Sequence, residues 1–278
     1  MPKTARAFDP RQVMHRPDFE VFHYHDAKMQ EVPLHHHDFY EVYYFLGGKV
    51  EYQVEGRSYV LSPDDILLIS PRELHRPKVA PDQAYERIVL WIDAAYLETL
   101  SREEPALPRC FETGNNLIPA GRTRASSLAR QLAEAAGSEG EGDVLRARGL
   151  FFQFLAELLG LARRQTAETR EPLEQPLISR VLEYIGEHFR ETLDLDMLAE
   201  RFFVSKYYLS HLFSSSVGTS LYRYILLKRL QHAKALLAEG VSPGEACRES
   251  GFQDYANFYR SFRSVYGLSP QNASAPQQ

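Results

Sequence analysis

Three consecutive histidines, His35 to His37, stand shortly before Glu41 in the aromatic-rich stretch PLHHHDFYEVYYFLGG, residues 33–48. Imidazole nitrogens and carboxylate oxygens are common ligands of zinc and other transition metals. The same groups also hydrogen-bond the hydroxyls of small polar molecules. The residue types alone therefore allow three interpretations: a catalytic metal centre, a ligand pocket, or a histidine cluster with only a structural role.

The spacing selects among these side chains if the stretch forms one unbroken β-strand, because residues two apart in a strand share a face. The odd-numbered side chains then point the same way: His35, His37, Phe39, Glu41, Tyr43 and Phe45. The even-numbered His36 points the other way with Asp38 and Tyr40. His36 is therefore predicted to lie outside the site.

The segments around these residues have the pattern of short strands. Residues 21–92 are rich in Val, Ile, Tyr and Phe between turn signals, and Gly47-Gly48 has the pattern of a hairpin. Strands of this length indicate a small antiparallel barrel or sandwich. From Thr123 to about residue 165, apolar residues recur at helical spacing instead.

The C-terminal third contains one helical pattern twice. In the second copy, Ser242 begins a short helix, Gly251 ends it, and Asp254 begins a longer helix. The first copy has the same order, and Ser205 begins its second helix. A short helix, a turn and a second helix with buried apolar residues form a helix-turn-helix. A helical hairpin in a bundle is the alternative for one copy alone, and the repetition favours two helix-turn-helix units.

The segment from Gly251 to Pro270 closely resembles the C-terminal signature of AraC/XylS-type transcription regulators. The characteristic positions are occupied without a gap: Gly251, Phe252, Asp254, Phe258, Arg260, Phe262, Gly267 and Pro270. The upstream unit, from Leu198 to Leu237, resembles the first helix-turn-helix of that family. The resemblance implies sequence-specific binding to a double-stranded DNA operator.

The positions of the family motif also imply which side chains contact DNA. The second helix of each unit is expected to enter the major groove, and the two units to lie about one turn of the DNA helix (~34 Å) apart. The candidate base contacts are Tyr207, Ser210 and His211 in the first unit, and Tyr255, Ala256, Asn257 and Arg260 in the second. The candidate phosphate contacts are Lys206, Arg229, Tyr259 and Arg263. A solvated helix face is the alternative for Lys206 and Arg263.

The N-terminal strands resemble a cupin barrel, the sensor domain of many AraC-type regulators. His35, His37, Glu41 and Gly48 match the first cupin motif, and His75 matches the histidine of the second. Asp64-Asp65 replaces the glycine-containing pair of the second motif, so that match is partial. The resemblance implies His35, His37, Glu41 and His75 as ligand-binding residues, and the shared strand face adds Phe39 and Tyr43 to the predicted set. Four of these could hold a divalent Fe, Mn, Ni or Zn ion: His35, His37, Glu41 and His75.

Composition narrows the class of protein further. The net charge of the whole chain is -5, yet residues 201–278 carry nine Lys/Arg against four Asp/Glu. The excess of acidic residues therefore lies upstream, and the C-terminal third can face the phosphates of DNA.

Cys110 and Cys247 are the only cysteines, which disfavours a disulfide framework and a thiolate zinc site and fits a reducing cytoplasm. An apolar signal region is not found at the N-terminus, and neither is a run of about 18 apolar residues that could span a membrane.

The sequence therefore predicts a multidomain α and β protein. Residues 1–165 are predicted to form a cupin-like β-barrel with flanking helices, for ligand sensing and dimerisation. Residues 166–176 are predicted to be a linker, and residues 177–270 an all-α domain of two helix-turn-helix units. Residues 271–278 are predicted to be a disordered tail. We expect a cytoplasmic transcription regulator, an activator and not an enzyme, without a required cofactor. It would sense a small polar effector such as a sugar, act as a homodimer and contact RNA polymerase.

Three alternatives stay open on the sequence alone. One is a cupin metalloenzyme, an isomerase or dioxygenase, that carries an accessory DNA-binding domain. Another is a regulator whose barrel has lost its ligand and only mediates assembly. The third concerns residues 123–165, whose helices could cap their own barrel and take no part in dimerisation.

Overall fold

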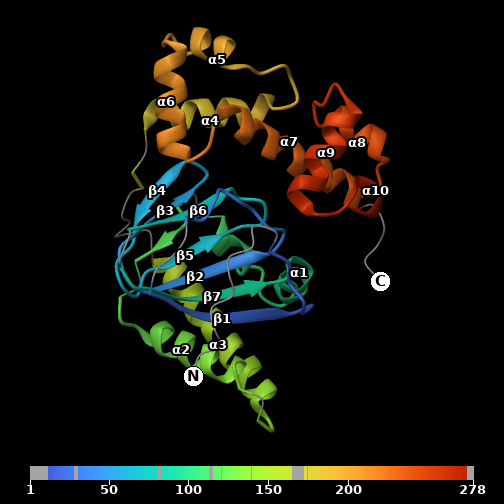
Figure 1. Cartoon of the computed structure of the whole chain (residues 1–278). Coiled ribbons are helices and arrows are strands. Elements are labelled where there is room, and N and C mark those ends of the chain that lie inside the picture. Colours follow the sequence, from blue (N-terminus) through green and yellow to red (C-terminus); the bar gives the residue numbers. More distant parts are fainter. Residues whose placement is uncertain are drawn as a thin grey trace. The chain divides into compact units, whose positions relative to one another are not determined.

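The structure is a computed structural model of the 278-residue chain and describes residues 12–27, 31–80, 83–112, 115–119, 121–138, 140–164, 172–173 and 175–273. The chain separates into two compact units (Figure 1). One contains Met1–Val54 and Ser58–Leu173, and the other contains Glu174–Gln278 with Glu55–Arg57. The first unit is built on β-sheets and the second is helical, which confirms the predicted fold class.

Two antiparallel sheets form the N-terminal unit. The strands of the larger sheet follow the order β1 (Phe19–Asp26), β7 (Tyr85–Ile92), β2 (Tyr40–Gly47), β5 (Ile66–Ile69) and β8 (Leu117–Ile118). The strands of the smaller sheet follow the order β4 (Arg57–Val60), β3 (Val50–Val54) and β6 (His75–Val79). Among the described residues the two sheets do not close into one barrel.

The turn predicted at Gly47-Gly48 is present, but the hairpin is not. β2 and β3 belong to different sheets, so this turn carries the chain from one sheet to the other. Gly48 has a φ of +113°, and a Cβ there would lie 2.6 Å from the carbonyl oxygen of Ala84. Both observations explain why glycine occupies the position.

The larger sheet buries both of its faces, and alternating side chains of β2 show the division. Val42 and Tyr44 pack in one core with helices α2 (Arg124–Ala136) and α3 (Asp143–Arg164). Tyr43 and Phe45 pack in a second core with residues of the smaller sheet. Figure 1 shows α2 and α3 along the β1 side of the sheets, and the short helices α1 (Ala94–Ser101) and η1 (Pro108–Phe111) follow β7.

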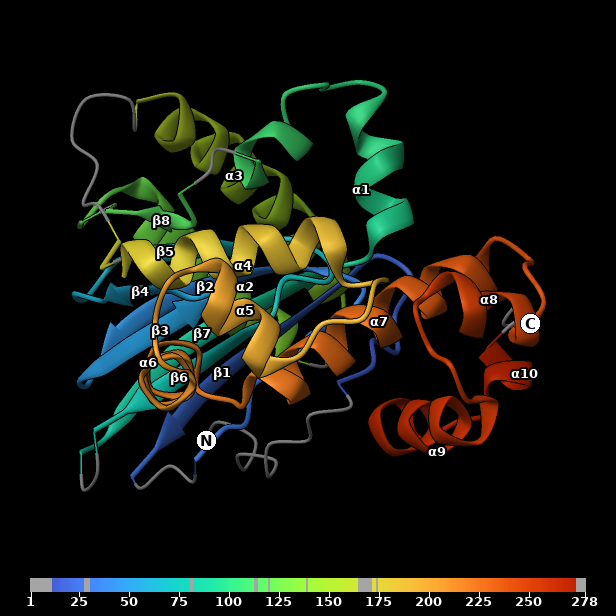
Figure 2. The same cartoon turned by 90° about the horizontal axis from the view of Figure 1, so that it is seen from above.

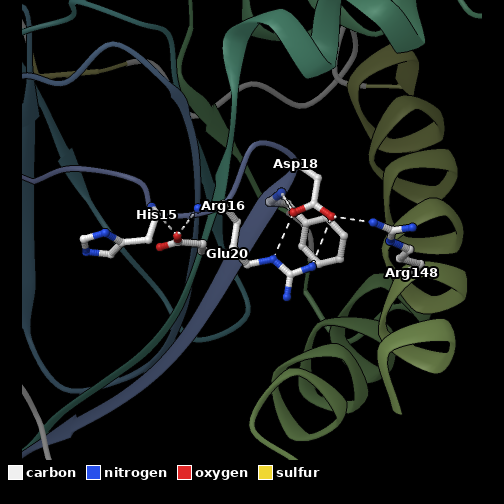
Figure 3. Close-up of polar contacts among 6 residues, drawn as sticks. His15, Arg16, Asp18, Glu20 and Arg148 are labelled. Carbon is white, nitrogen blue, oxygen red and sulfur yellow. Dashed lines mark hydrogen bonds and ion pairs between the residues drawn. The ribbon is translucent and has the colours of Figure 1, made fainter. Parts of the chain in front are cut away.

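Asp18 ties the segment before β1 to α3 (Figure 3). Its carboxylate accepts hydrogen bonds from Arg16 Nε at 2.9 Å, from Arg148 Nη2 at 3.1 Å and from the backbone N–H of Phe19 at 2.8 Å. Burial by itself raises the pKa of Asp18, but the hydrogen bonds from Arg16, Phe19 and Arg148 outweigh it, and the pKa falls to about 2. The carboxylate is therefore ionised whenever the unit is folded near neutral pH.

Asp18→Asn is expected to lower the free energy of unfolding by about 1–2 kcal/mol at pH 7, since the asparagine keeps the size but loses the charge that both arginines face. Because the pKa of folded Asp18 lies below its unfolded value, this stabilisation is complete above about pH 4 and is lost as the pH falls towards 2. Urea unfolding followed by the fluorescence of Trp91, the only tryptophan, checks this. A gap between variant and wild type that stays constant from pH 7 to pH 3 would refute it.

The helical unit contains α4 (Pro176–His188), α5 (Leu195–Arg201), α6 (Lys206–Val217), α7 (Leu221–Ala238), α8 (Pro243–Glu249), α9 (Tyr255–Tyr266) and α10 (Pro270–Ala273). The predicted helix starts are confirmed. Ser205 accepts from the backbone N–H of Tyr208, and Asp254 accepts from the N–H groups of Ala256 and Asn257. Figure 2 shows α8, α9 and α10 grouped at one end of α7.

The predicted tail differs from the structure at its beginning. Residues 271–273 continue α10, whose Ser269 Oγ accepts from the N–H of Asn272 at 3.3 Å. Residues 274–278 lie outside the described residues, as do most of the predicted linker positions. In the part of the chain that the structure describes, none of the helices is both long enough and apolar enough to cross a membrane.

Candidate DNA-binding surface and ligand site

The predicted base-contacting side chains lie on the solvent-facing sides of α6 and α9. All seven are exposed: Tyr207, Ser210, His211, Tyr255, Ala256, Asn257 and Arg260. The opposite side of each helix is buried, through Leu209 and Phe213 in α6 and through Phe258 and Phe262 in α9. Packing of these apolar residues therefore fixes which side of each helix is presented to solvent.

The four predicted phosphate contacts divide into two groups. Lys206 and Arg263 are exposed at the surface, Tyr259 is half-buried, and Lys206 Nζ lies 3.1 Å from Asp196 Oδ1. Arg229 differs, because its Nε donates to the carbonyl of Phe189 at 2.6 Å and its Nη2 to that of Glu191 at 2.6 Å. The structure thus gives Arg229 a role in closing the C-terminal end of α4, and a phosphate contact by the same side chain stays a prediction.

The histidines are positioned by a different backbone path from the one predicted. β2 begins only at Tyr40, so the premise of one unbroken strand from His35 to Glu41 is wrong. His35 instead forms an isolated bridge with His75, each N–H donating to the other's carbonyl at 3.1 and 2.9 Å. The N–H of Arg72 donates to the carbonyl of His37 at 2.8 Å. These bonds place the histidine segment against β6.

The structure nevertheless brings together the residues that the sequence singled out. His37, Glu41 and His75 are buried, and one potential ligand atom from each lies within 4.8 Å of the other two. His37 Nε2 is 3.3 Å from Glu41 Oε2. The His35 ring is 4.3 Å from the His75 ring, measured between centroids. His36 is also buried but is not one of the three converging residues.

Backbone carbonyls determine which nitrogen of each ring carries the proton. The Nδ1 atoms of His35, His37 and His75 lie 3.0, 2.8 and 2.7 Å from carbonyl oxygens of Pro33, Phe39 and Glu73. A carbonyl only accepts, so each Nδ1 is the donor and the Nε2 of the neutral ring presents a lone pair. Among the described residues, the buried Nε2 atoms of His37 and His75 have no hydrogen-bond partner. Two imidazole lone pairs therefore converge on one carboxylate.

Glu41 is held from the opposite strand. Its Oε2 accepts from the indole N–H of Trp91 at 2.9 Å, and its Oε1 from the hydroxyl of Tyr52 at 3.4 Å. Burial raises the pKa of Glu41, but the electrostatic effect of the neighbouring His37, 3.3 Å away, followed by that of His75 and His35, outweighs it, and the pKa falls to about 2. Burial, followed by the close approach of the His37 ring, lowers the pKa of His75 to about 4. The site therefore combines an ionised carboxylate with a neutral His75 at neutral pH.

Aromatic rings complete the site. Phe39 stacks on His37 with centroids 3.9 Å apart, and Tyr43 packs against Tyr52 at 4.8 Å. The Tyr43 hydroxyl pairs with that of Tyr85. The sequence did not indicate Trp91 and Tyr52. Trp91 lies directly opposite Glu41 in the β2–β7 register, a pairing across 50 positions that local patterns do not specify.

The residues fit a divalent cation by the chemistry of their donor set. An ion about 2.0–2.2 Å from nitrogen and oxygen ligands needs those ligands roughly 3–3.5 Å apart, and the separation of His37 Nε2 and Glu41 Oε2 is 3.3 Å. Two imidazole nitrogens that lack a partner within the described ranges, together with a carboxylate, supply a suitable set. The same acceptors also suit a ligand with several hydroxyl donors.

Comparison with known proteins agrees with both halves of this description. A family model described as an AraC-like ligand binding domain matches residues 16–155, which is half of the chain, and one described as a helix-turn-helix domain matches residues 198–275. The chain belongs to the AraC family of transcription regulators. The predicted family is thereby confirmed, and the AraC-family assignment places DNA binding in the helix-turn-helix unit and effector binding in the sheet unit.

Individual AraC-family relatives are similar over most of their length. The chain is 31% identical over 229 residues to the arabinose operon regulatory protein of Salmonella typhimurium, which covers 79% of this chain and 78% of that one. It is 26% identical over 235 residues to YbfI, an HTH-type transcriptional regulator of Bacillus subtilis, with 82% of each covered. It is 25% identical over 246 residues to the HTH-type transcriptional activator RhaS of Salmonella arizonae, with 86% of each covered. AraC-family proteins are regulators and not enzymes, so the metalloenzyme alternative is set aside.

Proposed function

We propose that this AraC-family regulator is an activator that responds to a small polar molecule, such as a sugar, bound at His37, Glu41 and His75. The observation that carries the proposal is the convergence of two buried imidazole lone pairs on one carboxylate, inside the domain that matches the ligand-binding model. Acting as a homodimer, the protein would recruit RNA polymerase to an operator read by α6 and α9.

The chemistry of the site defines the kind of effector. Carboxylate oxygens and imidazole lone pairs accept hydrogen bonds, so they complement a molecule that presents several donors. Phe39 and Trp91 lie beside them, with ring centroids 4.6 Å apart, and apolar rings of this kind suit the C–H surfaces of such a molecule. A polyol has both features, whereas an anionic effector would place its charge against the carboxylate of Glu41.

A thermal-shift screen of neutral sugars against acidic and amine-bearing analogues tests the effector class, because a ligand that binds only the folded state raises the melting temperature. Arabinose is the first probe, since a relative of this chain is an arabinose operon regulatory protein. Stabilisation by neutral sugars supports the proposal. Stabilisation by acidic compounds alone would contradict it.

A second candidate, a resident divalent metal, is favoured by the Nε2 atoms of His37 and His75, which lack a partner among the described residues. When bound, such an ion would supply a positive charge that neutralises Glu41. Metal analysis of protein purified without an affinity tag distinguishes the candidates. One equivalent of metal that is lost in His37→Ala would establish the metal, and metal-free protein that still responds to a sugar would establish direct binding.

We propose Arg260 as the principal base-reading side chain of the second unit. It is exposed on α9, opposite the buried Phe258 and Phe262, and a guanidinium can bind guanine O6 and N7 in bidentate fashion. Arg260→Ala is expected to weaken binding to the preferred operator by about 1–3 kcal/mol and to relax base preference at one position. Gel-shift titration at fixed salt measures both effects.

Arg248→Ala is the control for this variant, because it removes an equal charge from α8 outside the recognition helix. It is expected to affect all DNA sequences alike. If Arg260→Ala also weakened every sequence equally, Arg260 would be a phosphate contact and the assignment would be wrong.

A further inference from the structure

The turn between α5 and α6 has a phenylalanine at a position that glycine usually occupies. Phe203 has a φ of +56°, in the left-handed region. Its N–H donates to the carbonyl of Glu200 at 3.1 Å, and the N–H of Val204 donates to the carbonyl of Ala199 at 3.0 Å. These two bonds form the Schellman motif that ends many helices, and the left-handed residue of that motif is most often glycine.

The second helix-turn-helix unit ends α8 with the same two bonds and does have the glycine. The N–H of Gly251, whose φ is +81°, donates to the carbonyl of Arg248 at 3.0 Å. The N–H of Phe252 donates to the carbonyl of Cys247 at 3.1 Å. Phe203 and Gly251 therefore occupy equivalent positions in the two units. A side chain at such a position lowers stability, because its Cβ crowds the backbone in the left-handed conformation.

Packing within the helical unit does not offset this strain. The Phe203 side chain is 95% exposed, the largest value among the large apolar residues that the structure describes. The preceding Phe202 makes the ring contacts of this turn instead, with its centroid 6.1 Å from that of Tyr184 and 5.5 Å from the Cζ atom of Arg180. A bulky residue held in a strained conformation without burial indicates a function outside the fold of its own unit.

The place of Phe203 in the chain favours DNA as the molecule that it contacts. Phe203 lies two residues before Ser205, the cap of α6, so the two Cα atoms are at most about 7.6 Å apart. In a helix-turn-helix, the N-terminal residues of the second helix contact the base edges. Tyr207, in the first turn of α6, is one of the predicted base contacts and is 81% exposed. Phe203 thus precedes the end of α6 that approaches the bases.

The chemistry of a phenyl ring determines what it can recognise in the major groove. The base edges there present mainly hydrogen-bond donors and acceptors, whereas thymine also presents an apolar C5 methyl group, which phenylalanine can contact. We propose that Phe203 packs on the methyl group of a thymine next to the bases read by α6. The first unit would then have a base preference that comes from its turn and not from its recognition helix. This rests on the proposed function in that α6 lies in the major groove.

Replacing single thymines of the preferred operator by deoxyuridine tests the contact, because each replacement removes one methyl group. For the full-length wild type, one such replacement is expected to weaken binding about fourfold, the equivalent of one buried methyl group. It should lie outside the block in which Arg260→Ala relaxes base preference. Phe203→Gly should weaken binding to the thymine operator about fourfold or more and should be insensitive to the replacement, since both changes remove the same contact. Gel-shift titration at fixed salt measures all four affinities.

Two properties of the variants keep the test specific. Phe203→Gly is expected to melt at the wild-type temperature or above, because glycine relieves the left-handed backbone, so its weaker binding does not come from unfolding. Phe203→Leu is the control that keeps an apolar side chain, and it should remain sensitive to deoxyuridine.

Three results would overturn the inference: wild-type operator affinity in Phe203→Gly, a deoxyuridine penalty that persists in this variant, or an equal loss of its affinity for every DNA sequence. Unchanged DNA affinity with a loss of transcription activation would assign Phe203 to a protein partner and would overturn it as well. Base preference in the block read by α9 is a separate readout. Failure of the thymine contact can therefore be distinguished from failure of operator recognition as a whole.

Discussion

Replacing Gly251 with alanine is expected to destabilise the helix-turn-helix unit by about 3 kcal/mol or more and to abolish operator binding. Gly251 has a φ of +81°, and a Cβ there would lie 2.5 Å from the carbonyl oxygen and 2.7 Å from the Cα of Arg190. Those atoms are backbone, so they cannot move aside as a flexible side chain would. Urea unfolding followed by circular dichroism, together with a gel shift, measures the loss.

Alanine variants of two other glycines show how much of the loss in Gly251→Ala comes from the steric clash with Arg190 and how much from the positive φ. Gly240 has a φ of +87°, but a Cβ there would meet no atom of the described residues within 4 Å, so Gly240→Ala should cost only about 1 kcal/mol. Gly244 lies within α8, where a Cβ would likewise meet none of the atoms that the structure describes, and Gly244→Ala should be neutral or slightly stabilising. If Gly251→Ala were no worse than Gly240→Ala, the close approach of Arg190 would have no role in holding the turn.

Glu41→Gln is expected to lower the affinity for the effector about 100-fold while leaving operator affinity and folding intact. The amide of the new side chain can donate to the Nε2 of His37, 3.3 Å from the present Oε2, and so would occupy an acceptor that the effector needs. Loss of a charge-assisted hydrogen bond and of that acceptor together account for about 3 kcal/mol. Because the pKa of folded Glu41 lies below its ordinary value, the carboxylate also stabilises the fold, so the variant should be somewhat less stable at pH 7 and is titrated at a temperature at which circular dichroism shows it folded.

The measurement is titration of the sugar that gives the largest thermal shift, followed by the fluorescence of Trp91, which contacts Glu41 directly. Glu86→Gln is the matched control, because Glu86 belongs to the same unit but pairs with His23 at the surface. It should bind the sugar like the wild type. Equal binding by Glu41→Gln would remove Glu41 from the ligand site.

Local sequence patterns predicted the helical unit well, because helix starts and ends depend on nearby residues. Ser205 and Asp254 cap the helices that they were predicted to cap, and Gly251 has the left-handed conformation expected of it. The exception is Pro270. From the sequence it was identified only as a position of the family signature, whereas Ser269-Pro270 also begins a helix, with proline in the first turn and serine as its cap.

Contacts between segments that are far apart in the sequence could not be predicted from local sequence patterns. The alternation of side chains correctly grouped His37 with Glu41, yet their strand is shorter than assumed, and the bridge from His35 to His75 holds the segment in its place. Arg229 matched a family position but donates to carbonyls at the end of α4, about 40 residues away, and only the folded structure shows that.

Selection of bound fragments from a random DNA pool by the full-length chain, with and without the stabilising sugar, tests the central claim most directly. A ligand-responsive, sequence-specific AraC-family regulator predicts enrichment of one motif with two conserved blocks about 10 base pairs apart, and a change in its recovery when the sugar is present. Recovery of unenriched sequences under both conditions would contradict the account.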